Sequence, residues 1–229
     1  MVDIIILAAL GVFGLIGYKK GLMKSILTLG SSLIALILSF IVYPIMTIVL
    51  RATPIYNWIY KMVGEKVGSM EFNGGVQSQG EAIVQNITWI PKILAEQIKN
   101  DNNTAMYKIL GATNIKEYII LYITQMLIGL LAILLTWIIL KLVLGIVIGL
   151  LSTIVEHLPV ISTFNRQGGL CIGIVKGLLI LSLITLTLPI LMEIPTMSNI
   201  QSAIQGSYIG KWLYENNLII IIYNNLFNA

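Results

Sequence analysis

Residues 25–50 read SILTLGSSLIALILSFIVYPIMTIVL and contain no charged side chain. About 20 consecutive apolar residues are enough for an α-helix to cross the hydrocarbon core of a bilayer. This stretch therefore predicts a transmembrane helix, with Pro44 near its far end.

The whole chain shares this apolar character. Of its 229 residues, 57% are hydrophobic and only 10% are charged, and the mean hydropathy is +0.92. Soluble domains carry about 25% charged residues, so this chain has too little polar surface to cover a globule. Disorder is excluded as well, because it requires low hydrophobicity and high net charge. An integral membrane protein remains.

Three further apolar stretches predict three more helices, at residues 1–18, 118–140 and 177–192. The first has a short uncharged core, residues 4–18, and we favour a span over a re-entrant loop. The last can extend back to Gln167 if the bilayer tolerates Lys176. We predict an all-α integral membrane protein with four transmembrane helices and additional amphipathic or interfacial helices.

The third apolar stretch continues beyond Lys141 to residue 155. A straight helix over residues 118–155 would be about 57 Å long, whereas the hydrocarbon core measures only about 30 Å. We therefore expect a break or bend near residues 141–145. An interfacial helix would follow and end around residues 157–159.

The charge pattern divides the chain into four regions. These are a first transmembrane hairpin (1–51), an extracytoplasmic loop with short amphipathic helices (52–117), a second hairpin with the interfacial helix (118–195) and an amphipathic tail (196–229). In the loop, Pro91 precedes one predicted helix, and Asn103 or Thr104 caps another that Gly111 ends. In the tail, Trp212 and Tyr214 are expected at the membrane interface.

Basic residues gather in the two short connections between predicted spans. Lys19, Lys20 and Lys24 lie in the first, and Lys141, Arg166 and Lys176 lie in the second, where Glu156 is the only acid. Since basic residues favour cytoplasmic connections, both connections are predicted to be cytoplasmic. Both termini and the loop of residues 52–117 are then predicted to be extracytoplasmic.

Glycines recur at helical spacing in the first and last predicted spans. The set comprises Gly11, Gly14, Gly17, Gly21, Gly169, Gly173 and Gly177. In lipid, glycines allow helix backbones to approach closely. We expect these two segments to pack closely, either with each other or with another subunit. A pair at Gly145 and Gly149 has the same spacing.

The pattern G-x-x-K-G occurs twice, at residues 17–21 and 173–177, and a positive charge needed at each cytoplasmic turn explains most of the similarity. Lys176 is interpreted as a residue near a helix start that reaches the cytoplasmic surface. Asp3 is interpreted as an outer-interface carboxylate at a helix N-terminus. An ion-path role for Asp3, Lys141 or Lys176 is the alternative.

Signatures of catalysis, cofactors and nucleic-acid binding are absent from the sequence. The chain has one His and one Cys, and neither zinc, esterase nor phosphate-loop motifs occur, so we predict no enzyme, no catalytic residue, no metal site and no cofactor. His157, although near Ser152 and Ser162, is interpreted as a helix-end residue. Cys171 is interpreted as a small packing residue on the glycine face. The net charge of +4 is attributed to the cytoplasmic turns rather than to nucleic-acid binding.

Several of these features together resemble the colicin V production protein (CvpA) family of bacterial inner-membrane proteins. They are the opening MVDIII, the turn at residues 17–21 with Lys20, and residues 159–177 with Asn165 and Arg166 before a glycine-rich helix. The resemblance covers the membrane parts, about two thirds of the chain.

The resemblance implies a multi-pass protein of the bacterial cytoplasmic membrane that supports toxin or bacteriocin production or export. We expect a homo-oligomeric channel or transporter component. The alternative is a non-transporting scaffold whose loop recruits an envelope or secretion protein. Besides a second copy or such a protein, the expected partner is the lipid bilayer.

Overall fold

The structure, a computed structural model, describes residues 1–72, 76–155, 162–191 and 199–227, and every regular element in these ranges is a helix. The helices are α1 (Val2–Arg51), α2 (Pro54–Gly68), α3 (Val76–Asn86), α4 (Lys92–Asn100), α5 (Thr104–Leu110), α6 (Ile115–Val155), α7 (Ser162–Thr185), α8 (Leu188–Leu191), α9 (Ile200–Gln205), α10 (Tyr208–Glu215) and α11 (Leu218–Phe227). Of these, α1, α6 and α7 contain segments long and apolar enough to cross a membrane. The all-α membrane fold is therefore confirmed.

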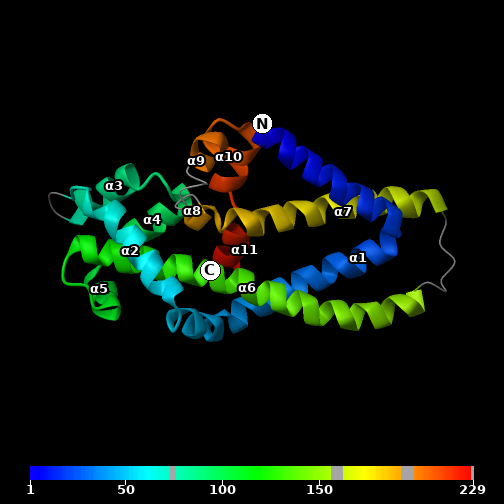
Figure 1. The fold of residues 1–229 in the computed structure, drawn as a ribbon, viewed down its shortest axis with the longest axis horizontal. Helices are drawn as coiled ribbons and strands as arrows, with labels where there is room; N and C mark the ends of the chain where they lie inside the picture. Colours follow the sequence, from blue (N-terminus) through cyan, green and yellow to red (C-terminus); the bar gives the residue numbers. More distant parts are fainter. Residues whose placement is uncertain (73–75, 156–161, 192–198, 228–229) are drawn as a thin grey trace.

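Helix α1 consists of two arms joined at Gly21. The backbone of Gly21 has φ 76° and ψ 169°, which interrupts the helix. Figure 1 shows that the chain runs outward along the first arm, turns sharply and returns along the second. We call residues 2–20 arm A and residues 22–51 arm B. A count of four spans requires each arm to cross the membrane separately, and that count remains a prediction.

Helix α6 is continuous over 41 residues, so the break predicted near residues 141–145 is wrong. At 1.5 Å per residue the helix is about 61 Å long. The surplus length is used at its N-terminal end, where Tyr118, Ile119 and Ile123 are fully buried among the short helices of the 52–117 region. There the Tyr118 hydroxyl donates to the Ile98 carbonyl over 2.8 Å. The predicted helix end at residues 157–159 lies outside the described residues.

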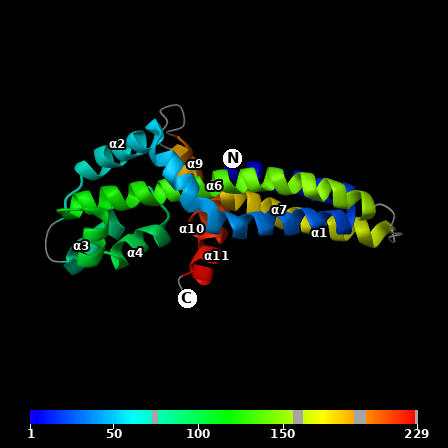
Figure 2. The ribbon, with the colours of Figure 1, turned by 90° about the horizontal axis from the view of Figure 1, so that it is seen from below.

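We call helices α2–α5 together with the first part of α6 the cap. Figure 2 shows α2 on one side of α6 and α3 and α4 on the other. Ile59, Val63 and Ile98 are fully buried between them, and they belong to the same hydrophobic core as the membrane helices. Helix α5 has the predicted caps, since Asn103 accepts a hydrogen bond from the Met106 amide and Gly111 adopts φ 73°.

Arm A, arm B, α6 and α7 form the membrane bundle. The Gly21 turn, the end of α6 and the start of α7 lie together at one end of it (Figure 1). Helix α7 begins at Ser162, before the predicted start at Gly177 and a little before the alternative start at Gln167. Lys176 therefore lies in the interior of a helix, and the interpretation that it sits near a helix start is wrong.

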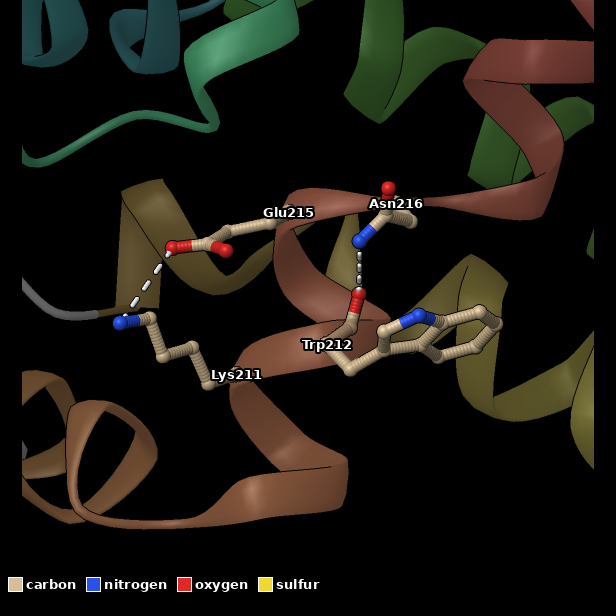
Figure 3. A network of polar contacts seen from close by, with 4 residues as sticks. All are labelled: Lys211, Trp212, Glu215 and Asn216. Atoms are coloured by element: carbon tan, nitrogen blue, oxygen red, sulfur yellow. Dashed lines mark hydrogen bonds and ion pairs between the residues drawn. The ribbon is translucent and has the colours of Figure 1, made fainter.

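The tail forms three short helices, α9–α11, instead of one amphipathic helix. Tyr214, predicted at the membrane interface, is buried and donates to the Trp89 carbonyl of the cap over 2.8 Å. This burial raises the pKa of the Tyr214 phenol. Trp212 is 49% exposed. Figure 3 shows it beside Lys211, which pairs with Glu215 at 3.9 Å, and Asn216, which donates to the Trp212 carbonyl.

Candidate functional site

The closest helix contact in the bundle joins arm A to α7 through glycines. A Cβ atom built on Gly17 would overlap the Gly169 carbonyl and lie 2.9 Å from the Cα atom of Gly173. A Cβ on Gly173 would overlap the Phe13 carbonyl. These obstacles are backbone atoms, which cannot rotate away. A Cβ on Gly169 would also lie 2.8 Å from the backbone of Gly21, so the structure brings together four of the glycines singled out in the sequence.

The other predicted packing glycines have different surroundings. Gly14 faces the Ile174 side chain, and Gly177 faces the Phe13 ring, with obstacles at 3.2 Å and 2.8 Å from a built Cβ. Gly11 and Gly145 face open space within 4 Å. Gly11 therefore does not take part in the contact between arm A and α7.

The two G-x-x-K-G motifs face each other, and only the first forms a turn. Gly21 ends arm A, whereas residues 173–177 are continuous helix. The explanation that both motifs mark turns is therefore wrong. Because Gly17 packs on Gly173, the lysine three residues beyond each glycine reaches the same cavity.

We call this cavity the lysine pocket. Its volume is about 150 Å³, and the residues lining it are Phe13, Ile16, Gly17, Lys20, Ser25, Thr28, Ile172, Gly173 and Lys176. The Ser25 hydroxyl donates to the Gly17 carbonyl over 3.2 Å, and the Thr28 hydroxyl donates to the Ser25 carbonyl over 3.0 Å. Both hydroxyl protons are therefore used in hydrogen bonds to backbone carbonyls. The ammonium groups are the donors that remain available to a ligand in the pocket.

Lys141 of α6 contacts arm B beside the lysine pocket, at Thr28. Its ammonium donates to the Thr28 carbonyl over 3.0 Å and to the Ser31 hydroxyl. One turn away, the Trp137 indole donates to the Ser32 carbonyl over 3.1 Å. Lys141 therefore anchors α6 to arm B.

Asp3 lies away from the lysines, at the start of arm A. Its carboxylate accepts hydrogen bonds from the Ser207 hydroxyl at 2.7 Å and from the Tyr208 and Ile209 amides at 3.1 and 2.7 Å. These amides open helix α10, so Asp3 caps the N-terminus of a helix more than 200 residues away. The structure does not bring Asp3 together with Lys141 and Lys176.

A second cavity lies between the cap and the membrane bundle. Its volume is about 310 Å³, and it is lined by arm B, α4, α5, α6 and the tail helix α11. The lining is mainly apolar, with Gln97, Gln125 and Tyr122 as polar members. We call it the apolar cavity. Leu186, between α7 and α8, also lines it, so its walls come from six separate segments, and no local sequence pattern indicates it.

Comparison with known proteins identifies the family. A family model described as colicin V production protein matches residues 95–217, which is more than half of the chain. This chain belongs to the colicin V production protein family. No curated protein and no solved structure gives a significant match. The family match includes Lys141, Lys176 and the α7 glycines, and it begins after arm A.

Asn165 and Arg166, singled out in the sequence by resemblance to the family, have different roles in the structure. The Asn165 side-chain oxygen accepts a hydrogen bond from the Leu22 amide over 2.6 Å, and so caps arm B directly after the Gly21 turn. Arg166 and Lys20 are exposed. The cap formed by Asn165 has no signal in the sequence, because donor and acceptor are 143 residues apart.

The last candidates from the sequence are Cys171, His157 and a metal site. Cys171 is exposed, so the interpretation that it packs on the glycine face is wrong. Its position explains this, because two residues along a helix from Gly169 or Gly173 lead to the opposite side. His157 lies outside the described residues. Among the residues that the structure describes, no group of three His, Cys, Asp or Glu side chains could hold a metal ion.

Proposed function

We propose that this chain is an oligomeric membrane component of toxin or bacteriocin production or export, and that its apolar cavity receives a hydrophobic segment of the exported peptide. Membership of the colicin V production family supports a role in toxin or bacteriocin production. The observation that carries the binding of an exported peptide is the apolar cavity itself. The proposal includes no enzymatic step.

The size and lining of the apolar cavity support binding of a short apolar segment. Ligand pockets typically measure about 300–1,000 Å³ and combine apolar walls with a few polar groups. At about 310 Å³ this cavity is at the lower limit, so it accommodates a few side chains at a time. The amides of Gln97 and Gln125 lie on its wall, where they could bond to the backbone of an extended peptide.

Filling the cavity tests the proposal. Gly129 of α6 lines it, and the nearest atom to a Cβ built there is in the Tyr43 ring at 3.9 Å, so a larger side chain can enter without a backbone clash. We expect Gly129→Leu to reduce the bacteriocin activity released by cells that depend on this chain. The measurement is growth inhibition of a sensitive strain by the culture medium.

Gly145→Leu is the matched control, because Gly145 lies on the same helix, is exposed and faces open space. Immunoblots of the membrane fraction must show equal amounts of both variants. Equal release from the two strains would contradict a role of the apolar cavity in export.

A scaffold that recruits an envelope partner is the second candidate function. The observation that favours it is the exposed apolar surface of the cap, where Ile109 is 74%, Trp58 44% and Tyr60 39% exposed. Exposed apolar patches mark contact sites for proteins or membranes. Solute flux distinguishes the two candidates. Only a permeation component lets solute cross the membrane of vesicles that contain the wild-type protein, and Lys176→Ala should then alter the rate. A monomeric mass in detergent would favour the scaffold.

A further inference from the structure

The lysine pocket gathers positive charge at one end of an apolar bundle. Lys20 of arm A and Lys176 of α7 line the pocket, and Lys141 of α6 donates to the carbonyl of Thr28, which also lines it, so three like charges gather there and repel one another. In the part of the chain that the structure describes, the ion pairs are formed by other lysines, and no carboxylate pairs with these three. Uncompensated charge between membrane helices is costly. An anion in the pocket would relieve this repulsion.

The donors of the pocket define the chemistry of that anion. The hydroxyl protons of Ser25 and Thr28 are held by backbone carbonyls, and Lys141 has already used two of its three donors. Lys20 and Lys176 therefore supply most of the free donors. Ammonium groups that converge from two helices suit a ligand with several negatively charged oxygens, such as a phosphate group.

The size of the pocket limits how much of a ligand can enter. The pocket volume of about 150 Å³ is below the roughly 300–1,000 Å³ typical of pockets that enclose a whole small molecule. This is room for a phosphate group with its oxygens, but not for a whole lipid or nucleotide. The rest of the ligand must lie outside the pocket.

The surface beside the pocket is apolar and exposed. Ile16, which lines the pocket, is 41% exposed, and Leu142 and Val175, the sequence neighbours of Lys141 and Lys176, are 68% and 52% exposed. In a bilayer such residues contact acyl chains. Basic pockets between transmembrane helices on the cytoplasmic side are places where anionic lipid headgroups bind. The charge distribution predicts that this end of the bundle faces the cytoplasm.

We propose that the lysine pocket binds the phosphate group of an anionic phospholipid whose acyl chains lie along the exposed apolar residues beside it. The ammonium groups of Lys20 and Lys176 contact the phosphate oxygens, and Lys141 adds charge from behind. The site is separate from the apolar cavity, so the proposal stands independently of peptide export.

Lipid retention by the purified full-length chain tests the proposal. The chain is incubated in mixed micelles of phosphatidylcholine and phosphatidylglycerol, and native mass spectrometry counts the lipids that stay bound. We expect preferential retention of phosphatidylglycerol, and weaker binding by about tenfold for each of Lys20→Gln and Lys176→Gln. Lys176→Arg, which keeps the charge, should retain the lipid.

The matched control removes two positive charges from the same end without touching the pocket. Lys19 and Arg166 are both exposed and do not line it, so the double variant Lys19→Gln, Arg166→Gln should bind phosphatidylglycerol as the wild type does. Circular-dichroism melting verifies that each variant folds.

Three results would overturn the proposal. The first is equal retention of the two lipids by the wild type, which needs no variant. The second is a loss in the control as large as in the pocket variants, which would indicate diffuse surface charge. The third is displacement of the lipid by inorganic phosphate at equal concentration, which would indicate a site for free anions.

Discussion

Gly173 shows how little space separates arm A from α7. Its Cα atom lies against Gly17, and a Cβ atom built on it would overlap the Phe13 carbonyl oxygen. In lipid the apolar solvent provides no hydrophobic drive for helix association, so close van der Waals contact must supply the attraction. The contact also sets the register in which Lys20 and Lys176 reach one pocket.

Gly173→Leu should therefore destabilise the protein. A leucine cannot fit without moving a backbone, and overpacking typically costs about 1–3 kcal/mol. The measurement is the free energy of unfolding in mixed micelles as denaturing detergent is added. Gly145→Leu, at an exposed glycine with open space around it, is the control. If the two variants lose equal stability, the glycine contact is not a determinant of packing.

At the residue scale, the sequence predicts features made by residues a few positions apart better than contacts between residues far apart in the chain. The spacing of Gly169, Gly173 and Gly177 identifies a surface of small residues, and the structure places arm A against it. The acceptor role of Asp3 depends on amides at residues 208 and 209, which fold beside it only in three dimensions. No local pattern could indicate that pairing.

The Gly21 turn is the element on which the shape of the bundle depends. Its φ of 76° and ψ of 169° lie in a region that is accessible to glycine and strained for other residues. The turn also leaves the first amides of arm B without helical partners. Asn165, from the start of α7, satisfies the Leu22 amide.

We expect Gly21→Ala to destabilise the protein by about 1–3 kcal/mol through backbone strain. Asn165→Ala should cost about 1 kcal/mol through loss of the cap. Gly30→Ala is the control, because Gly30 lies within arm B with open space around it and alanine favours a helix. Detergent-induced unfolding followed by tryptophan fluorescence measures all three. A Gly21→Ala variant as stable as Gly30→Ala would contradict the strained turn.

Element boundaries show where sequence reasoning fails and why. The bilayer thickness predicted a break in α6, but the cap buries Tyr118 and Ile119 and so uses the extra length outside the bundle. The charge of Lys176 suggested that α7 starts late in the sequence. Contact with arm A instead stabilises a helix that continues through Lys176. In both cases tertiary packing decides a boundary that hydropathy alone leaves open.

At the scale of the whole molecule, the described structure gathers the Gly21 turn, the end of α6 and the start of α7 at one end of the bundle (Figure 1). The basic residues of both short connections belong to this end. The positive-inside rule then predicts that it is cytoplasmic, with the cap outside.

Fusions of alkaline phosphatase, which is active only outside the cytoplasm, test the orientation. We expect a fusion after Gly75 to be active and a fusion after Lys20 to be inactive. Immunoblots control for equal amounts of the two fusion proteins. The reverse pattern would place the lysine pocket at the outer surface and invert the predicted topology.

The hydrogen bond between Asn165 and Leu22 also has a consequence for biogenesis. At roughly 5–20 residues per second, the ribosome needs about 7 to 29 seconds to add the 143 residues that separate the two partners. In the predicted four-span arrangement, the first hairpin enters the membrane during that interval with its turn uncapped and its glycine surface uncovered. The first hairpin therefore reaches its final form only when α7 has been synthesised and inserted, so assembly of the bundle waits for the second half of the chain.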